Sequence, residues 1–85
     1  MFTITDSAGA YLAHMLDEEP AGEAVRFVFG LRGLEPQPSV VLPGDTTFEH
    51  DGRIVLVLDK TMCQMLEDKT LDVEETKTGP TLRLL

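Results

Sequence analysis

The side chains that could take part in chemistry are few in this chain of 85 residues. The single cysteine, Cys63, could act as a thiolate nucleophile or as a soft metal ligand. Its neighbours Met62, Met65 and Leu66 are apolar, however, which favours a small packing residue in a core. The alternative left open is a reactive thiol, or one iron ligand that each subunit contributes across a symmetric interface.

The two histidines are the other candidate metal ligands. His14 and Glu18 are four residues apart, so on one helix they would lie on the same side and could hold a metal ion. His50 lies between Glu49 and Asp51, but neighbouring residues of a strand point to opposite faces and do not converge. We therefore expect a solvated helix face for the first pair and a turn histidine in water for His50.

Acidic runs occur at Asp17–Glu19 and Glu74–Glu75. Neither run has an ordered ligand loop around it, and both are typical of solvated surfaces that keep a protein soluble. The sequence has no glycine-rich phosphate loop, no Ser-His-Asp order with a nucleophile elbow and no catalytic carboxylate pair. We therefore expect no catalytic residues, and a binding module is favoured over an enzyme.

Composition limits the partners of the protein. Seven Lys and Arg against 15 Asp and Glu give a net charge of -8, which would repel a phosphate backbone, so no nucleic acid partner is expected. No apolar run approaches the roughly 20 residues that span a bilayer, and the first residues lack the pattern of a secretory signal. A lone cysteine forms no intrachain disulfide. We expect one cytoplasmic domain over residues 1–85, stabilised by its apolar core and without a membrane partner.

Hydrophobic periodicity predicts the elements that position these residues. Thr5 is the expected N-cap of a helix over about 6–18. The Asp-Gly pair within His50–Arg53 predicts a tight hairpin turn, and Asp59 is the expected cap of a second helix, Lys60–Glu67. The prolines of Arg32–Pro38 predict a loop. Strands are predicted at Ala24–Leu31, Ser39–Leu42, Thr46–Glu49, Ile54–Leu58, Thr70–Glu75 and Thr81–Leu84.

With a short extended segment ahead of the first helix, the predicted order of elements is β-α-β-β-β-β-α-β-β. Hairpin connections dominate this order, so we expect a mainly β, α+β fold: a small mixed or antiparallel β-sandwich or pseudo-barrel with two short helices.

The apolar residues of the central strands are numerous for a chain of this size. They could all belong to one sandwich core, or their number could exceed what a small core buries. A surplus exposed at the surface would indicate self-association or a protein partner. The residues in question are Val25, Phe27, Val28, Phe29, Val40, Val41, Ile54, Leu56 and Leu58.

Six local strings are informative together with the order of elements: Ile4–Ala8, Val25–Phe27, Phe48–Gly52, Ile54–Val57, Met62–Leu66 and Thr70–Val73. These strings and their order resemble the HesB-like domain of the A-type iron-sulfur cluster assembly proteins, over nearly the whole chain. The resemblance implies the small mixed-sheet fold of that family, a place in iron-sulfur assembly and oligomeric association.

The cysteines of that family are where this sequence departs from it. The family has one cysteine in a Gly-Cys-x-Gly loop after the central strand and two in a Cys-x-Cys tail, because soft thiolates hold iron and sulfide. With Arg26 aligned, the loop cysteine position holds Leu34, preceded by Gly33, and the second glycine position holds Pro36. No cysteine pair follows the last predicted strand.

The resemblance therefore implies a degenerate member with no cofactor, a non-enzymatic binding or accessory module that acts with a protein partner or as a homo-oligomer. The alternative is a carrier of iron or of an iron-sulfur cluster with relocated ligands that meet across an oligomer interface. The candidates for those ligands are Cys63, His14 and His50.

Overall fold

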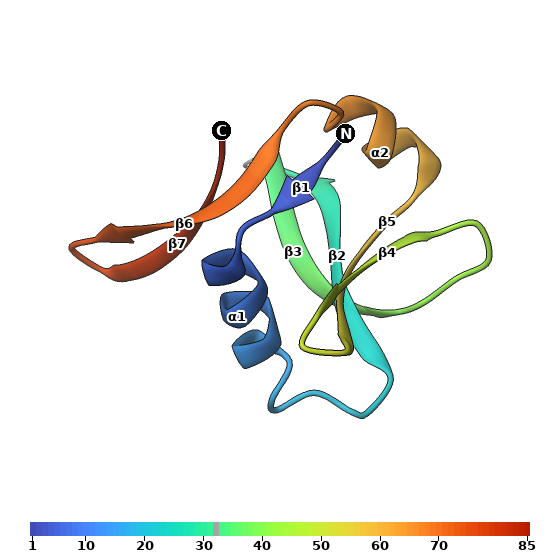
Figure 1. The fold of residues 1–85 in the computed structure, drawn as a ribbon, viewed down its shortest axis with the longest axis horizontal. Coiled ribbons are helices and arrows are strands. Elements are labelled where there is room, and N and C mark those ends of the chain that lie inside the picture. The colour runs from blue at the N-terminus through green and yellow to red at the C-terminus, as the bar shows by residue number, and fades with distance from the viewer. Residues whose placement is uncertain (32) are drawn as a thin grey trace.

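The computed structural model describes residues 1–31 and 33–85 (Figure 1). Its elements follow the predicted order, and the mainly β class with two short helices is confirmed. They are β1 (Thr3–Ile4), α1 (Asp6–Met15), β2 (Glu23–Gly30), β3 (Gly33–Val40), β4 (Thr46–His50), β5 (Arg53–Leu58), α2 (Lys60–Met65), β6 (Thr70–Thr76) and β7 (Gly79–Leu84).

The strands form two mixed sheets. The first has the order β3-β2-β5-β4 and the second the order β1-β6-β7, and neither order closes into a barrel. The pairs β2–β5 and β1–β6 are parallel, and the other pairs are antiparallel. Helix α1 packs against strands of both sheets, and the β6–β7 hairpin extends away from the four-stranded sheet (Figure 1). Neither helix has the length and the apolar run that crossing a membrane requires.

Helix α1 begins where the sequence predicts. The N–H of Ala8 donates to the Thr5 hydroxyl oxygen at 3.1 Å, so Thr5 is the N-cap. The predicted end near residue 18 is wrong, because the helix ends at Met15. The next residues form tight turns in which Asp17 and Glu19 donate to carbonyl oxygens three residues earlier, as is common where a helix tightens at its end.

Strand β3 contradicts the predicted loop at Arg32–Pro38. Of that stretch, residues 33–38 pair with β2, while Arg32 lies outside the described residues. Pro36 and Pro38 lie opposite Phe27 and Val25. Because β3 is an edge strand of its sheet, the N–H groups that its two prolines lack are not needed for pairing on both sides, as they would be in a central strand. The predicted strand Ser39–Leu42 is therefore the end of β3, followed by a loop.

The hairpin between β4 and β5 confirms the predicted turn. Asp51 and Gly52 have φ values of 52° and 80°, the left-handed pair that a two-residue hairpin turn of type I′ needs. Asp59 caps α2 as predicted, since its carboxylate accepts from the N–H of Met62 at 2.7 Å.

The core lies between the sheets and the helices. Residues 55–58 of β5 are all buried, because this central strand is covered on both faces. Of the apolar residues considered above, Val25, Phe27, Leu56 and Leu58 belong to the core. Three of the others, Phe29, Val40 and Val41, are exposed, so part of the apolar surplus does lie at the surface.

Candidate functional site

An apolar crevice of about 240 Å³ opens where the two sheets diverge. Helix α1 forms its floor, strands β2 and β3 form one wall, and strands β6 and β7 form the other. Arg83 is its charged residue. The crevice is lined by Tyr11, Met15, Phe27, Leu34, Pro36, Leu71, Thr81, Leu82 and Arg83.

Leu34 forms part of the β3 wall of this crevice. It is paired with Phe29 of β2, and residues paired across an antiparallel ladder share one face of the sheet. Leu34 is partly buried and packs against the core cluster. Phe29 is 59% exposed and extends the same apolar face toward the tip of the hairpin. The position aligned with the loop cysteine therefore holds a packing residue of an ordered strand.

Strand β7 forms the opposite wall. Leu82 and Leu84 are paired with Val73 and Leu71 of β6, so these four side chains share one face of the sheet, and Leu82 packs against the core. Arg83 lies on the other face, where Nη1 is 3.2 Å from Oε1 of Glu74. The crevice thus has apolar walls with charges at its margin.

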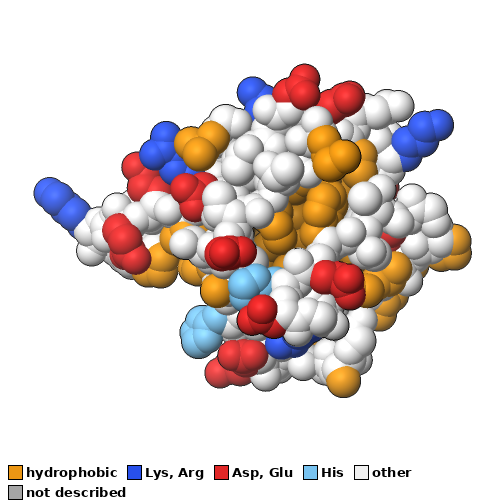
Figure 2. All heavy atoms as spheres, viewed as in Figure 1, with side chains coloured by type: hydrophobic (Ala, Val, Ile, Leu, Met, Phe, Trp, Pro, Cys, Tyr) orange, Lys and Arg blue, Asp and Glu red, His pale blue; other side chains and the backbone are white. Residues whose placement is uncertain are grey.

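Cys63 lies away from this crevice, in a second hollow of about 570 Å³. Figure 2 shows the apolar floor of that hollow between the N-terminal segment, α2 and β4. The thiol is half-buried and packs against the core, and its Sγ lies 3.9 Å from the carbonyl oxygen of Leu58. Phe2 and Phe48, which also line the hollow, meet edge to face with ring centroids 5.3 Å apart.

His14 does not form the helical pair that its spacing with Glu18 suggests. The helix ends at Met15, so Glu18 lies beyond it, and the expected common helix face is wrong for this pair. His14 is exposed, and its Nδ1 lies 3.5 Å from Oδ2 of Asp17.

His50 corrects the expectation of a turn histidine in water. Its side chain is only 20% exposed and lies over Gly9 of α1, where an added Cβ would be 2.5 Å from Nδ1. Its Nε2 is 3.4 Å from Oδ2 of Asp51. The signal in the sequence was Gly9, a helix position without a side chain that leaves room for an imidazole. Within residues 1–31 and 33–85, no three His, Cys, Asp or Glu side chains gather into a metal-binding group.

Three solved structures resemble the chain closely in shape. SufA of Escherichia coli, described as involved in the biosynthesis of iron-sulfur clusters, superposes with a TM-score of 0.79 at 18% identity, covering 99% of this chain and 83% of SufA. IscA solved with a [2Fe-2S] cluster gives 0.66 at 15% identity, covering 100% and 84%. A protein from Aquifex aeolicus gives 0.66 at 22% identity, covering 99% and 89%.

This chain has the HesB-like fold of the A-type iron-sulfur assembly proteins. The fold that the sequence resemblance implies is therefore confirmed, and identities of 15 to 22% establish the fold alone. No family model matches the sequence, and no curated protein matches it at a significant level.

One ion pair of this HesB-like fold was not predicted from the sequence. Arg26 and Asp45 are joined by two hydrogen bonds, one of them 3.0 Å from Nη1 to Oδ1, and their side chains are 11% and 3% exposed. Asp45 also accepts from the N–H of Leu42 at 2.7 Å, and Arg26 donates to Ser39 at 2.9 Å. The pair fixes the loop that presents Val41 and Leu42 to solvent.

The electrostatics of that pair follow from its contacts. The hydrogen bonds from Arg26, and then the one from the Leu42 N–H, hold the pKa of Asp45 below its usual range. The partners are 19 residues apart, so no local pattern links them. The available signal was Arg26 itself, a charge between the apolar residues Val25 and Phe27.

Proposed function

We propose that this chain is a non-enzymatic protein-binding module that keeps the A-type fold and holds no iron-sulfur cluster at the position of Leu34. The observation that carries the proposal is the place of Leu34, a hydrocarbon side chain on the crevice wall that packs against the core. A leucine has no lone pair for iron, whereas iron-sulfur clusters are held by thiolates.

The count of thiols supports the same proposal. The chain carries one cysteine, so one subunit can offer one thiolate, whereas a [2Fe-2S] cluster takes four ligands. A lone thiol without a disulfide suits a reducing compartment, and we place the protein in the cytoplasm. The consecutive exposed apolar residues Val40, Val41 and Leu42 support a protein partner, since exposed apolar patches mark interaction sites.

Anaerobic reconstitution with ferrous iron and sulfide tests this function. We expect the protein to remain colourless, with far less than one iron per chain after desalting, and Cys63→Ser to give the same result. Stoichiometric iron and sulfide with charge-transfer absorption in the wild type would contradict the proposal.

A carrier with relocated ligands is the second candidate, favoured by the place of Cys63 on the wall of an open hollow. Two subunits that met there could bring two thiolates together. This candidate predicts that Cys63→Ser abolishes bound iron and that the iron-loaded protein is oligomeric. It fails if the iron content of Cys63→Ser equals that of the wild type.

A further inference from the structure

The four sheet edges of the described residues differ in how well they are protected against pairing with another strand. Exposed edges attract further strands, and proteins protect them with prolines, bulges or very short strands. Edge β3 contains two prolines, β4 has an irregularity between Phe48 and Glu49, and β1 has two residues. In β7 the only proline is Pro80, which leaves Thr81–Leu84 unprotected.

The hydrogen-bond pattern of β7 shows which backbone groups face outward. Thr70 and Leu85 exchange both backbone bonds, at 3.3 and 2.8 Å, so they form a hydrogen-bonded pair. Such pairs alternate with non-hydrogen-bonded pairs along an antiparallel ladder. The pairs of Leu84 with Leu71 and of Leu82 with Val73 are therefore of the second kind. The N–H and C=O groups of Leu82 and Leu84 point away from β6.

Leu71 supports this assignment independently. Its carbonyl oxygen accepts from the N–H of Thr5 at 3.0 Å, on the β1 side of β6, and so points away from β7. The outward groups of Leu82 and Leu84 thus form a short row of donors and acceptors at an open edge, and an extended backbone is the ligand that matches such a row.

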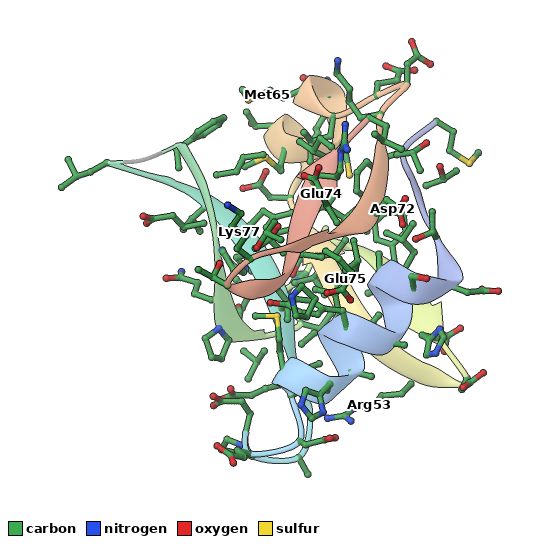
Figure 3. The ribbon with its side chains drawn as sticks, turned by 90° about the vertical axis from the view of Figure 1, so that its left-hand side faces the viewer. Arg53, Met65, Asp72, Glu74, Glu75 and Lys77 are labelled. Atoms are coloured by element: carbon green, nitrogen blue, oxygen red, sulfur yellow. The ribbon has the colours of Figure 1, made fainter. Side chains whose placement is uncertain are left out.

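The crevice would determine which side chains a strand added at this edge can carry. Leu82 lines it opposite Leu34 and Pro36, so every second side chain of a strand added to β7 would face these apolar walls. The charge of the protein favours a basic segment, since the chain carries -8 overall. Figure 3 shows Asp72, Glu74, Glu75 and Lys77 along the β6–β7 hairpin, where Glu74 is paired with Arg83.

A second copy of the chain fits this edge poorly. Antiparallel pairing of two β7 strands centred on Arg83 sets two arginines directly opposite each other, which is destabilising. Pairing centred on Leu82 sets Leu84 opposite Pro80, which has no N–H to donate. Both arrangements also bring together two proteins of net charge -8.

We propose that an extended segment of a protein partner, with apolar residues at alternate positions and a net positive charge, adds as a strand to the free edge of β7 and fills the crevice beside Leu34. This inference rests on the proposed function and names the surface and the kind of partner that it uses.

Amide hydrogen exchange of the full chain tests the proposal with a synthetic probe. The probe is the peptide acetyl-Lys-Thr-Val-Thr-Val-Thr-Lys-amide, and its control replaces both lysines by glutamates. We expect saturating probe to slow exchange at Leu82 and Leu84 by at least about fivefold, with weaker binding of the acidic control. Unchanged exchange at both amides would overturn the proposal.

Two variants at one exposed position separate what the backbone contributes to probe binding from what the side chain contributes. Leu84→Pro removes the outward N–H, and Leu84→Ala shortens the same side chain but keeps that group. We expect Leu84→Pro to weaken probe binding about tenfold relative to Leu84→Ala, the effect of one backbone hydrogen bond. Equal affinities of the two variants would overturn the proposal, and the exchange data on the wild type stand even if Leu84→Pro does not fold.

The remaining outcomes are also decisive. Protection of Leu82 and Leu84 that rises with protein concentration without probe would overturn the proposal and assign the edge to a second copy. Probe binding to a protein that also holds a stoichiometric cluster would support this surface while contradicting the proposed function. An iron-free protein that does not bind the probe would be consistent with the proposed function but would overturn this inference.

Discussion

At the scale of single residues, Arg26 and Asp45 connect strand β2 to the loop before β4. Asp45 is almost fully covered, and its carboxylate accepts hydrogen bonds from Arg26 and from the Leu42 N–H. Because these bonds favour the charged form, the pKa of Asp45 is lower in the folded protein than in the unfolded chain. This residue therefore links the stability of the fold to pH.

The variant Asp45→Asn tests that link. A carboxyl group whose pKa is lowered by folding stabilises the folded state at pH values above its pKa in the unfolded chain. That stabilisation is lost as the pH falls through its pKa in the folded protein. We expect the variant to have a lower free energy of unfolding than the wild type at neutral pH, with the difference shrinking as the pH falls below 3.8, the ordinary pKa of an aspartate side chain. Urea unfolding across this range measures it, with the exposed Glu75→Gln as control. A difference that does not change with pH would refute the link.

Thr5 is the second residue with a measurable role. It caps α1 and also donates to Oδ1 of Asp72 at 2.8 Å, which lowers the pKa of Asp72. We expect Thr5→Ala to reduce the free energy of unfolding by about 1–2 kcal/mol and to raise the pKa of Asp72. Chemical denaturation and carboxyl NMR titration measure these effects. Thr5→Ser keeps the hydroxyl and should remain near the wild type, and equal loss in both variants would argue against the cap.

At the scale of elements, α1 and β4 meet where His50 lies over Gly9. In a free helix, Gly→Ala stabilises by about 1 kcal/mol. Here the added methyl group would collide with the imidazole, so we expect Gly9→Ala to destabilise the wild type and to stabilise a His50→Ala protein. A double-mutant cycle of thermal or urea unfolding measures this coupling. The same sign of effect in both backgrounds would show that the two residues do not touch.

Elements set by local signals were predictable from the sequence. The caps Thr5 and Asp59 and the turn at Asp51 and Gly52 act within three or four residues, and all are where the sequence places them. Strand β3 was not predictable in this way. Its prolines argue against a central strand, and only the sheet order reveals that β3 is an edge where they are tolerated.

At the scale of the whole molecule, the resemblance of scattered strings predicted the fold, which the likeness to SufA and IscA confirms. The candidate site was harder to predict from the sequence. The aligned position of Leu34 came from the sequence, but the crevice needs Leu82 and Tyr11, which lie far from it in the chain. The contact of His50 with Gly9 was missed for the same reason, because packing between distant elements leaves no local pattern.

We propose that the A-type fold persists here without a cluster at the position of Leu34. The most direct measurement is the iron and sulfide content of the full chain purified anaerobically from iron-supplemented cells, read together with its visible spectrum. We predict a colourless protein with iron far below one atom per chain. A coloured protein with stoichiometric iron and acid-labile sulfide would contradict this proposal.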